Sequence, residues 1–415
     1  ALAATTISAG ILTADSSVYT VGTTSISTVN SGTGTQTYSG LVKLGGATSF
    51  STNNSNLTFD STLNSDSTGA KALTISAGSG TVTFSGAVGN LYALAATTVT
   101  AGTLTFSDDF YSTGHVVLTA TTLSTAAAKV FSVISSANLT MTADSLAIGA
   151  ALTGSPGGTL TIQPRANSTT VGIGSSAAGS LAIDDTELDY INGKFGTLIL
   201  GSSTGTALVT VNYTVGSFTY SQPLTLRSNT GGITASDILK TGSYALTITG
   251  GTLTLQAVYS GTLAVTGSLI NLNSLVTTTG LAGTQTYTGP VALGASVIQL
   301  DTRGSGSEAG SNISFSSTVN TSSGFYYAMT INAGAGSVTF GGAVGNTQAL
   351  SLLTVTSTHA TGITLTGNVT TRGNQDYFGK VLLNADTTIA TTNNGYVNIT
   401  GTVSSGLIAS NVGVS

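Results

Sequence analysis

Apolar and polar residues alternate along most of this chain. Runs such as Thr81–Phe84 (TVTF), Thr159–Ile162 (TLTI) and Ser337–Phe340 (SVTF) place an aliphatic or aromatic residue at every second position, with Thr or Ser between. This period of two predicts strands with one buried face and one face toward water. Segments rich in Gly, Ser and Asn separate the runs and predict turns. Only 175–191 and the segment ALAATTV (93–99) could form a short helix.

The chain also repeats a motif of the form Gly-x-Gln-x-Tyr-x-Gly-x-Val-x-Leu. It reads GTQTYSGLVKL at 34–44 and GTQTYTGPVAL at 283–293, and an altered copy, GNQDYFGKVLL, occupies 373–383. Apolar residues again fall on alternate positions. We expect the three motif tyrosines to occupy equivalent places in the fold; they are Tyr38, Tyr287 and Tyr377.

Longer blocks match as well. LTISAGSGTVTFSGAVGN (73–90) corresponds to MTINAGAGSVTFGGAVGN (329–346), so Phe84 and Phe340 should also be equivalent. The repeated blocks lie near 34–106 and 283–366, with a partial third copy at 373–403. Differences in length fall in turn-like segments such as 301–311, as in repeat proteins whose stacked strands are kept while loops vary.

Self-similar blocks of short strands favour a parallel β-helix over a sandwich or barrel, because each coil must stack on the previous one. With ~20–25 residues per coil and ~4.8 Å between coils, the chain would make roughly 17–20 coils and a rod on the order of 80–95 Å long. We therefore predict an all-β solenoid with little or no helix. Residues 1–415 would form one continuous domain.

Composition narrows the possible functions. The 415 residues include 10 Lys+Arg, 15 Asp+Glu, 54 Gly and no Cys, and charged residues make up 6%. A net charge of −5 with scattered cations gives no electrostatic footprint for nucleic acid or an anionic membrane. The lack of Cys excludes disulfides and thiolate metal sites. The sequence contains no continuous apolar stretch long enough to predict a transmembrane segment.

These features resemble the filamentous-haemagglutinin-like and autotransporter-like β-strand-repeat surface adhesins of Gram-negative bacteria. The likeness rests on the two GTQTY motifs, on 73–90 and 329–346, and on 187–212 (ELDYINGKFGTLILGSSTGTALVTVN). It implies a right-handed parallel β-helix, export to the cell surface or beyond it, and a role in adhesion or matrix building. The family's N-terminal secretion cap is not visible in this sequence, which leaves the export route open.

One acidic cluster is a candidate metal site. Its carboxylates lie on near-alternate positions of IDDTELDYI and could bind Ca²⁺ through oxygen ligands; they are Asp184, Asp185, Glu187 and Asp189. The alternative is a solvated segment whose acids cap a short helix, with Asp185 or Thr186 as the N-cap. The alternative is favoured, because the glycine-rich nonapeptides of Ca²⁺-binding β-helices are missing from the sequence. No other cofactor is expected.

Other chemistry has less support. Asp108 and Asp109 suit a turn, and His115 and His359 are isolated from other metal-ligand residues. A polysaccharide-cleaving site needs clustered carboxylates or a cation beside Ca²⁺, and only 184–194 offers enough titratable groups. We therefore expect no enzymatic activity. Ice binding by Thr-x-Thr pairs is not favoured, because the pairs are not expected to stay in register when coil length varies.

Two functions remain. The first is a rigid, repetitive adhesin stalk or matrix scaffold outside the cell, which contacts a host, another cell or an abiotic surface. The second is a self-assembling subunit of an extracellular filament, sheath or surface layer. Open strand edges on the end coils and the low charge favour homotypic self-association.

Overall fold

Over the residues that it describes, the computed structural model is nearly all parallel β, with one short helix, and forms a β-solenoid of about 18 turns. The predicted fold class is confirmed. Two compact units, Ala1–Gly205 (unit 1) and Thr206–Ser415 (unit 2), are described separately. In the predicted variable turn at 301–311, Ser305, Ser307 and Glu308 lie outside the described residues. The structure describes residues 2–3, 6–29, 32–280, 283–304, 306 and 309–406.

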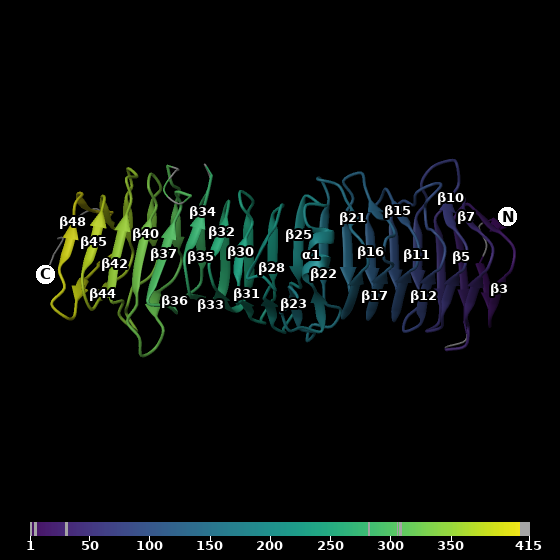
Figure 1. The fold of residues 1–415 in the computed structure, drawn as a ribbon, viewed down its shortest axis with the longest axis horizontal. Coiled ribbons are helices and arrows are strands. Elements are labelled where there is room, and N and C mark those ends of the chain that lie inside the picture. The colour runs from purple at the N-terminus through teal and green to yellow at the C-terminus, as the bar shows by residue number, and fades with distance from the viewer. Residues whose placement is uncertain are drawn as a thin grey trace. The chain divides into compact units, whose positions relative to one another are not determined.

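Unit 1 winds three parallel sheets around one core, and the chain visits each sheet once per regular coil (Figure 1). Sheet 1A contains β2 (Thr6–Ala9), β5 (Thr24–Thr28), β8 (Thr48–Thr52), β11 (Leu73–Ser76), β13 (Thr97–Thr100), β16 (Val116–Thr119), β19 (Leu139–Thr142), β22 (Thr159–Gln163) and β25 (Thr197–Gly201). Sheet 1B contains β3 (Leu12–Ala14), β6 (Gln36–Tyr38), β9 (Leu57–Phe59), β12 (Thr81–Phe84), β14 (Thr103–Phe106), β17 (Thr122–Thr125) and β20 (Ser145–Ile148). Sheet 1C contains β1 (Leu2–Ala3), β4 (Val18–Val21), β7 (Val42–Leu44), β10 (Leu63–Ser65), β15 (Phe110–Ser112), β18 (Phe131–Val133) and β21 (Leu152–Thr153).

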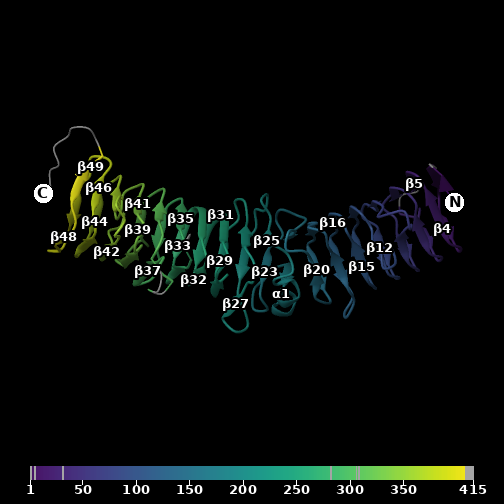
Figure 2. The ribbon, with the colours of Figure 1, turned by 90° about the horizontal axis from the view of Figure 1, so that it is seen from above.

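Unit 2 has the same three-sheet plan, seen from a second direction in Figure 2. Sheet 2A contains β27 (Ser217–Thr219), β30 (Ile238–Lys240), β32 (Val258–Ser260), β34 (Val276–Thr278), β37 (Val297–Asp301), β40 (Ala328–Asn332), β42 (Leu352–Thr356), β45 (Gln375–Phe378) and β48 (Val397–Ile399). Sheet 2B contains β28 (Leu224–Arg227), β35 (Gln285–Thr288), β38 (Ile313–Phe315), β41 (Val338–Phe340), β43 (Ile363–Leu365), β46 (Val381–Leu383) and β49 (Val403–Ser405). Sheet 2C contains β26 (Val209–Val211), β29 (Ile233–Ala235), β36 (Val291–Leu293), β39 (Val319–Thr321), β44 (Val369–Thr371) and β47 (Ile389–Thr391). Two long strands, β31 (Leu246–Leu255) and β33 (Leu263–Leu272), serve both sheets 2B and 2C.

Helix α1 (Asp185–Ile191) follows two short paired strands, β23 (Val171–Ile173) and β24 (Leu181–Ile183). It buries Leu188 and Ile191, leaves Asp189 exposed, and covers Asp185 and Glu187 in part. The sequence predicted this helix. The other candidate, 93–99, is wrong as a helix: its end forms part of β13, where Thr97 and Val99 point inward. β-branched residues at those positions fit a pleated strand better than a helix.

Aromatic rings stack inside both units. On sheet 1B the ring centroids are 5.1, 5.2 and 4.9 Å apart, in the order Tyr38, Phe59, Phe84 and Phe106. On sheet 2B the spacings are 5.0 and 5.2 Å, in the order Tyr287, Phe315 and Phe340. Parallel pairing in register places like residues above one another at the coil spacing. The predicted equivalence of Tyr38 with Tyr287, and of Phe84 with Phe340, is confirmed.

The third motif tyrosine breaks this pattern. Tyr377 is buried like the others, but it lies on β45 of sheet 2A, whereas Tyr287 lies on β35 of sheet 2B. Its predicted equivalence is therefore wrong. The motif keeps its polar contacts when it changes sheets. In each copy the Tyr hydroxyl donates to the Gln side chain two residues earlier, at 3.0, 2.9 and 2.8 Å, and Gln Nε2 donates to a carbonyl 15 or 16 residues later.

The second glycine of the motif is required by close approach between coils. Gly289 has φ +123°, and a Cβ there would lie 1.9 Å from the carbonyl oxygen of Gly267 in the preceding coil. Its counterparts meet the preceding coil in the same way, with distances of 2.4 Å at Gly40 and 2.1 Å at Gly379. A side chain at this place must push two coils apart.

We expect Gly289→Ala to lower the free energy of unfolding by about 2 kcal/mol, because it adds both a backbone clash and an unfavourable φ. Denaturant unfolding measures the loss. Gly242→Ala is the matched control: Gly242 has φ +57° and open space around its Cβ position, so only the smaller φ cost of about 1 kcal/mol should appear. Equal losses in the two variants would show that coil approach is unimportant.

The outer face of sheet 1A carries two rows of polar residues in register over seven coils. One row contains Ser25, Ser49, Thr74, Thr98, Val117, Thr140 and Thr161, and the other contains Ser27, Ser51, Ser76, Thr100, Thr119, Thr142 and Gln163. The prediction that such pairs would fall out of register is wrong, because varying coil lengths are absorbed in the corners. Val117 and Gln163 interrupt the rows, so they do not form a uniform lattice of hydroxyl groups.

Candidate functional surfaces

The acidic segment of 184–189 caps helix α1. Asp184 is the N-cap, where Asp185 or Thr186 was expected, and its Oδ1 accepts a hydrogen bond from the Glu187 amide at 2.8 Å. Glu187 Oε2 accepts in return from the Asp184 amide at 3.1 Å. This reciprocal pair is a capping box, which satisfies amides that the first helical turn leaves open. Asp189 is exposed on the last part of the helix.

The same segment docks the helix onto neighbouring loops. Glu187 Oε1 accepts from the Ile148 amide at 2.7 Å, and Asp185 Oδ1 accepts from the Ser175 amide at 3.0 Å. Burial raises the pKa of Glu187, although the backbone donors at Ile148 and Asp184 oppose that shift. Three of the four carboxylates, those of Asp184, Asp185 and Glu187, are therefore held by backbone amides, and Ca²⁺ binding at this segment stays a prediction. Among the described residues, no group of three His, Asp or Glu side chains is placed to hold a metal ion.

The remaining sequence candidates have local roles. Asp108 forms an ion pair with Lys129 at 2.5 Å, and Asp109 accepts from the Val130 amide, so both hold a turn as expected. His115 Nδ1 accepts from the Asn138 amide of the next coil at 2.9 Å. His359 Nδ1 accepts from the Thr361 amide at 3.1 Å.

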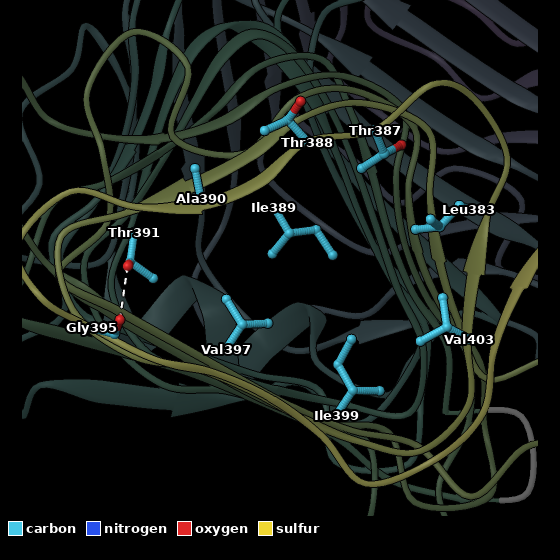
Figure 3. A pocket seen from close by; sticks show the side chains of 10 residues that line it. All are labelled: Leu383, Thr387, Thr388, Ile389, Ala390, Thr391, Gly395, Val397, Ile399 and Val403. Carbon is cyan, nitrogen blue, oxygen red and sulfur yellow. Dashed lines mark hydrogen bonds between the residues drawn. The ribbon is translucent and has the colours of Figure 1, made fainter. Parts of the chain in front are cut away.

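Side chains of the last described coils of unit 2 line a cavity inside the solenoid (Figure 3). Ile389, Val397 and Val403 point into a cavity of about 420 Å³, and Val397 and Val403 are 38% and 39% exposed. Their register partners one coil earlier, Val369, Gln375 and Val381, are buried. The cavity therefore belongs to the apolar interior of the solenoid.

The corner after β10 in unit 1 is held by an ion pair. Asp66 Oδ1 accepts from the amide and hydroxyl of Thr68, at 3.0 and 2.6 Å, and lies 3.4 Å from Lys71 Nζ. Chiefly because of the Thr68 hydroxyl, the pKa of Asp66 falls from 3.8 to about 2. Tyr19 donates its hydroxyl to the second carboxylate oxygen at 3.2 Å.

The lowered pKa predicts acid sensitivity at this corner. Because the folded-state pKa lies below the unfolded one, the stabilisation is present above pH 4 and is lost as pH falls toward 2. Unfolding free energy measured from pH 5 to pH 2 should therefore fall less steeply in Asp66→Asn than in the wild type. Parallel pH profiles for the two proteins would contradict the assignment.

The corresponding corner of the second repeated block is different. Residues 319–332 align with 63–76, and where the first block has Gly69, Ala70 and Lys71 the second has Phe325, Tyr326 and Tyr327. The backbone is equivalent: Asn64 Oδ1 accepts from the Leu91 and Tyr92 amides, and Asn320 Oδ1 accepts from those of Thr347 and Gln348. Sequence reasoning missed this aromatic corner, although comparison of the two blocks residue by residue would have found it.

No helix among the described residues combines the length and apolarity needed to cross a membrane. A scan against protein-family models, a search of curated proteins and a search of solved structures each returned no match to this chain.

Proposed function

We propose that this chain is a stiff scaffold segment of an extracellular bacterial surface protein, acting as an adhesin stalk or matrix element. One observation carries the proposal: parallel strands pair in register from coil to coil within each unit, around a continuous apolar interior. Every regular coil hydrogen-bonds to the coils before and after it, which resists bending and leaves little unpaired backbone for proteases. The resemblance of its repeats to the haemagglutinin-like adhesins supports an exported location.

The test combines location and mechanics. Antibodies against the chain should label intact cells of the source bacterium, and protease treatment of those cells should leave the solenoid as a resistant fragment. Labelling only after lysis would overturn the extracellular role. In single-molecule pulling, the chain should unfold at high force and in discrete steps, because stacked coils detach one after another. Smooth extension at low force would overturn the scaffold role.

A second candidate is a self-assembling subunit, favoured by the low charge of the chain, of which charged residues make up 6%. Head-to-tail addition of such subunits would give an open filament. Electron microscopy and size-exclusion chromatography of native material separate the two candidates. Ordered filaments or lattices favour assembly, and isolated rods attached to cells favour the stalk.

A further inference from the structure

We propose that the aromatic corner of unit 2 is a binding site for an acidic polysaccharide, and that its ligand unit is a uronic acid ring. The corner is a shallow, open depression that spans four successive coils. It is lined by Gly324, Phe325, Tyr326, Tyr327, Ser351, Leu352, Arg372, Gly373 and Asn393. The site is additional to the scaffold role and does not depend on it.

The aromatic side chains are exposed where most others of this protein are buried. Phe325 and Tyr326 are 53% and 45% exposed, and neighbouring Leu352 is 44% exposed. Phe325 stacks on Tyr327, with centroids 5.3 Å apart and planes 14° from parallel. Large apolar groups that cluster on an open surface mark interaction sites more often than scattered ones do.

Arg372 supplies the charge of the site. Its guanidinium carbon lies over the Tyr326 ring, 4.2 Å from the ring centroid, in a cation–π contact. Within the described part of the chain, Arg372 forms no ion pair: the three that occur involve Lys71, Lys129 and Arg303. A guanidinium group carries five N–H donors, and it can bind a carboxylate through two parallel hydrogen bonds.

The first repeated block shows that the fold does not need these residues. By strand register, Tyr326 corresponds to Ala70 and Arg372 to Thr113, while Leu352 corresponds to Ala96. The corner hydrogen bonds are the same in both blocks: Ser112 donates to the Gly114 carbonyl at 3.1 Å, and Thr371 donates to that of Gly373 at 2.6 Å. The first block therefore forms the same corner without these aromatic and cationic side chains, so the fold does not require them.

The chemistry of the corner fits a uronic acid. A pyranose ring has an apolar face of C–H groups, which suits an exposed aromatic ring, and a rim of hydroxyl groups, which suits the Ser351 hydroxyl and Asn393 amide. A carboxylate on the ring suits Arg372. An open depression running across several coils accommodates a linear polymer, whereas a small ligand is usually enclosed.

The test uses sodium polygalacturonate as the probe and its fully methyl-esterified form as the neutral match, with the 415-residue chain and isothermal titration calorimetry. The wild type should bind polygalacturonate and bind the ester roughly tenfold more weakly. Two variants carry residues of the first block at the equivalent positions: Phe325→Gly/Tyr326→Ala, and Arg372→Thr. Each should weaken binding of polygalacturonate roughly tenfold or more without changing the thermal unfolding midpoint by more than a few degrees.

Tyr92→Gln is the matched control, because Tyr92 is a 40% exposed tyrosine of unit 1 whose counterpart in the second block is Gln348. It should bind like the wild type. The proposal is overturned if the wild type does not bind polygalacturonate, if both polymers bind equally, or if the variants of the corner bind as well as Tyr92→Gln. Each of these results would leave the scaffold proposal intact, since that is tested by location and mechanics.

Discussion

Phe315→Ala is expected to lower the free energy of unfolding by about 3–5 kcal/mol, the range for removing a buried aromatic ring. Phe315 is 1% exposed and lies between Tyr287 and Phe340, with ring centroids 5.0 and 5.2 Å away. Removing the middle ring leaves a cavity that neighbouring coils cannot close, because their spacing is set by backbone hydrogen bonds. Both adjacent rings lose their stacking partner as well.

Denaturant unfolding of the 415-residue chain measures this loss of stability. Hydrogen exchange at the amides of β35, β38 and β41 shows whether the loss is confined to the strands that carry the aromatic stack. The matched control is Phe325→Ala, which removes the same side chain from a surface place that is 53% exposed. Its effect should stay within about 0.5 kcal/mol. Similar losses in the two variants would mean that the aromatic stack does not stabilise the solenoid.

Gln285→Leu is expected to cost about 3 kcal/mol, although it makes the core more apolar. The buried Gln285 side chain donates from Nε2 to the carbonyls of Asp301 and Val276, at 3.1 and 3.3 Å, and accepts the Tyr287 hydroxyl at 2.9 Å. Leucine fills similar space but leaves these buried groups without their partner, and each such group costs about 1–3 kcal/mol.

A double-mutant cycle separates the two halves of this network. Tyr287→Phe alone should cost about 1 kcal/mol, because it removes one buried hydrogen bond. Gln285→Leu combined with Tyr287→Phe should cost less than the sum, since no hydroxyl is then left unsatisfied. Full additivity, or a Gln285→Leu protein as stable as the wild type, would show that the network does not hold the corner.

The Gln–Tyr motif shows which features of the fold can be predicted from the sequence and which cannot. Gln and Tyr two residues apart point to the same side of a strand, so the motif itself predicts that both are buried together. It does not say which sheet receives them. Tyr377 lies on sheet 2A because the corners before it, and not its own motif, decide how the coil is divided among three sheets.

The functional surfaces, too, were predictable from the sequence only in part. The acids of 184–189 were visible in the sequence as a cluster, but the capping box depends on a helix start at Asp185, one residue from the expected place. Tyr326 and Arg372 are 46 residues apart in the sequence and meet only because three successive coil corners are stacked. No local pattern connects them.

The sequence by itself determined the strand period, the repeats, the all-β class and the residues that fill the interior, because alternation and turn residues act over a few neighbouring positions. Only the tertiary structure decided which strands share a sheet, whether the outer Thr and Ser stay in register, and which corners come together. Those features depend on how unequal loops distribute their extra residues between coils. That distribution is a property of the whole stack, so the contact between Tyr326 and Arg372 in the aromatic corner could be recognised only once the coils were in place.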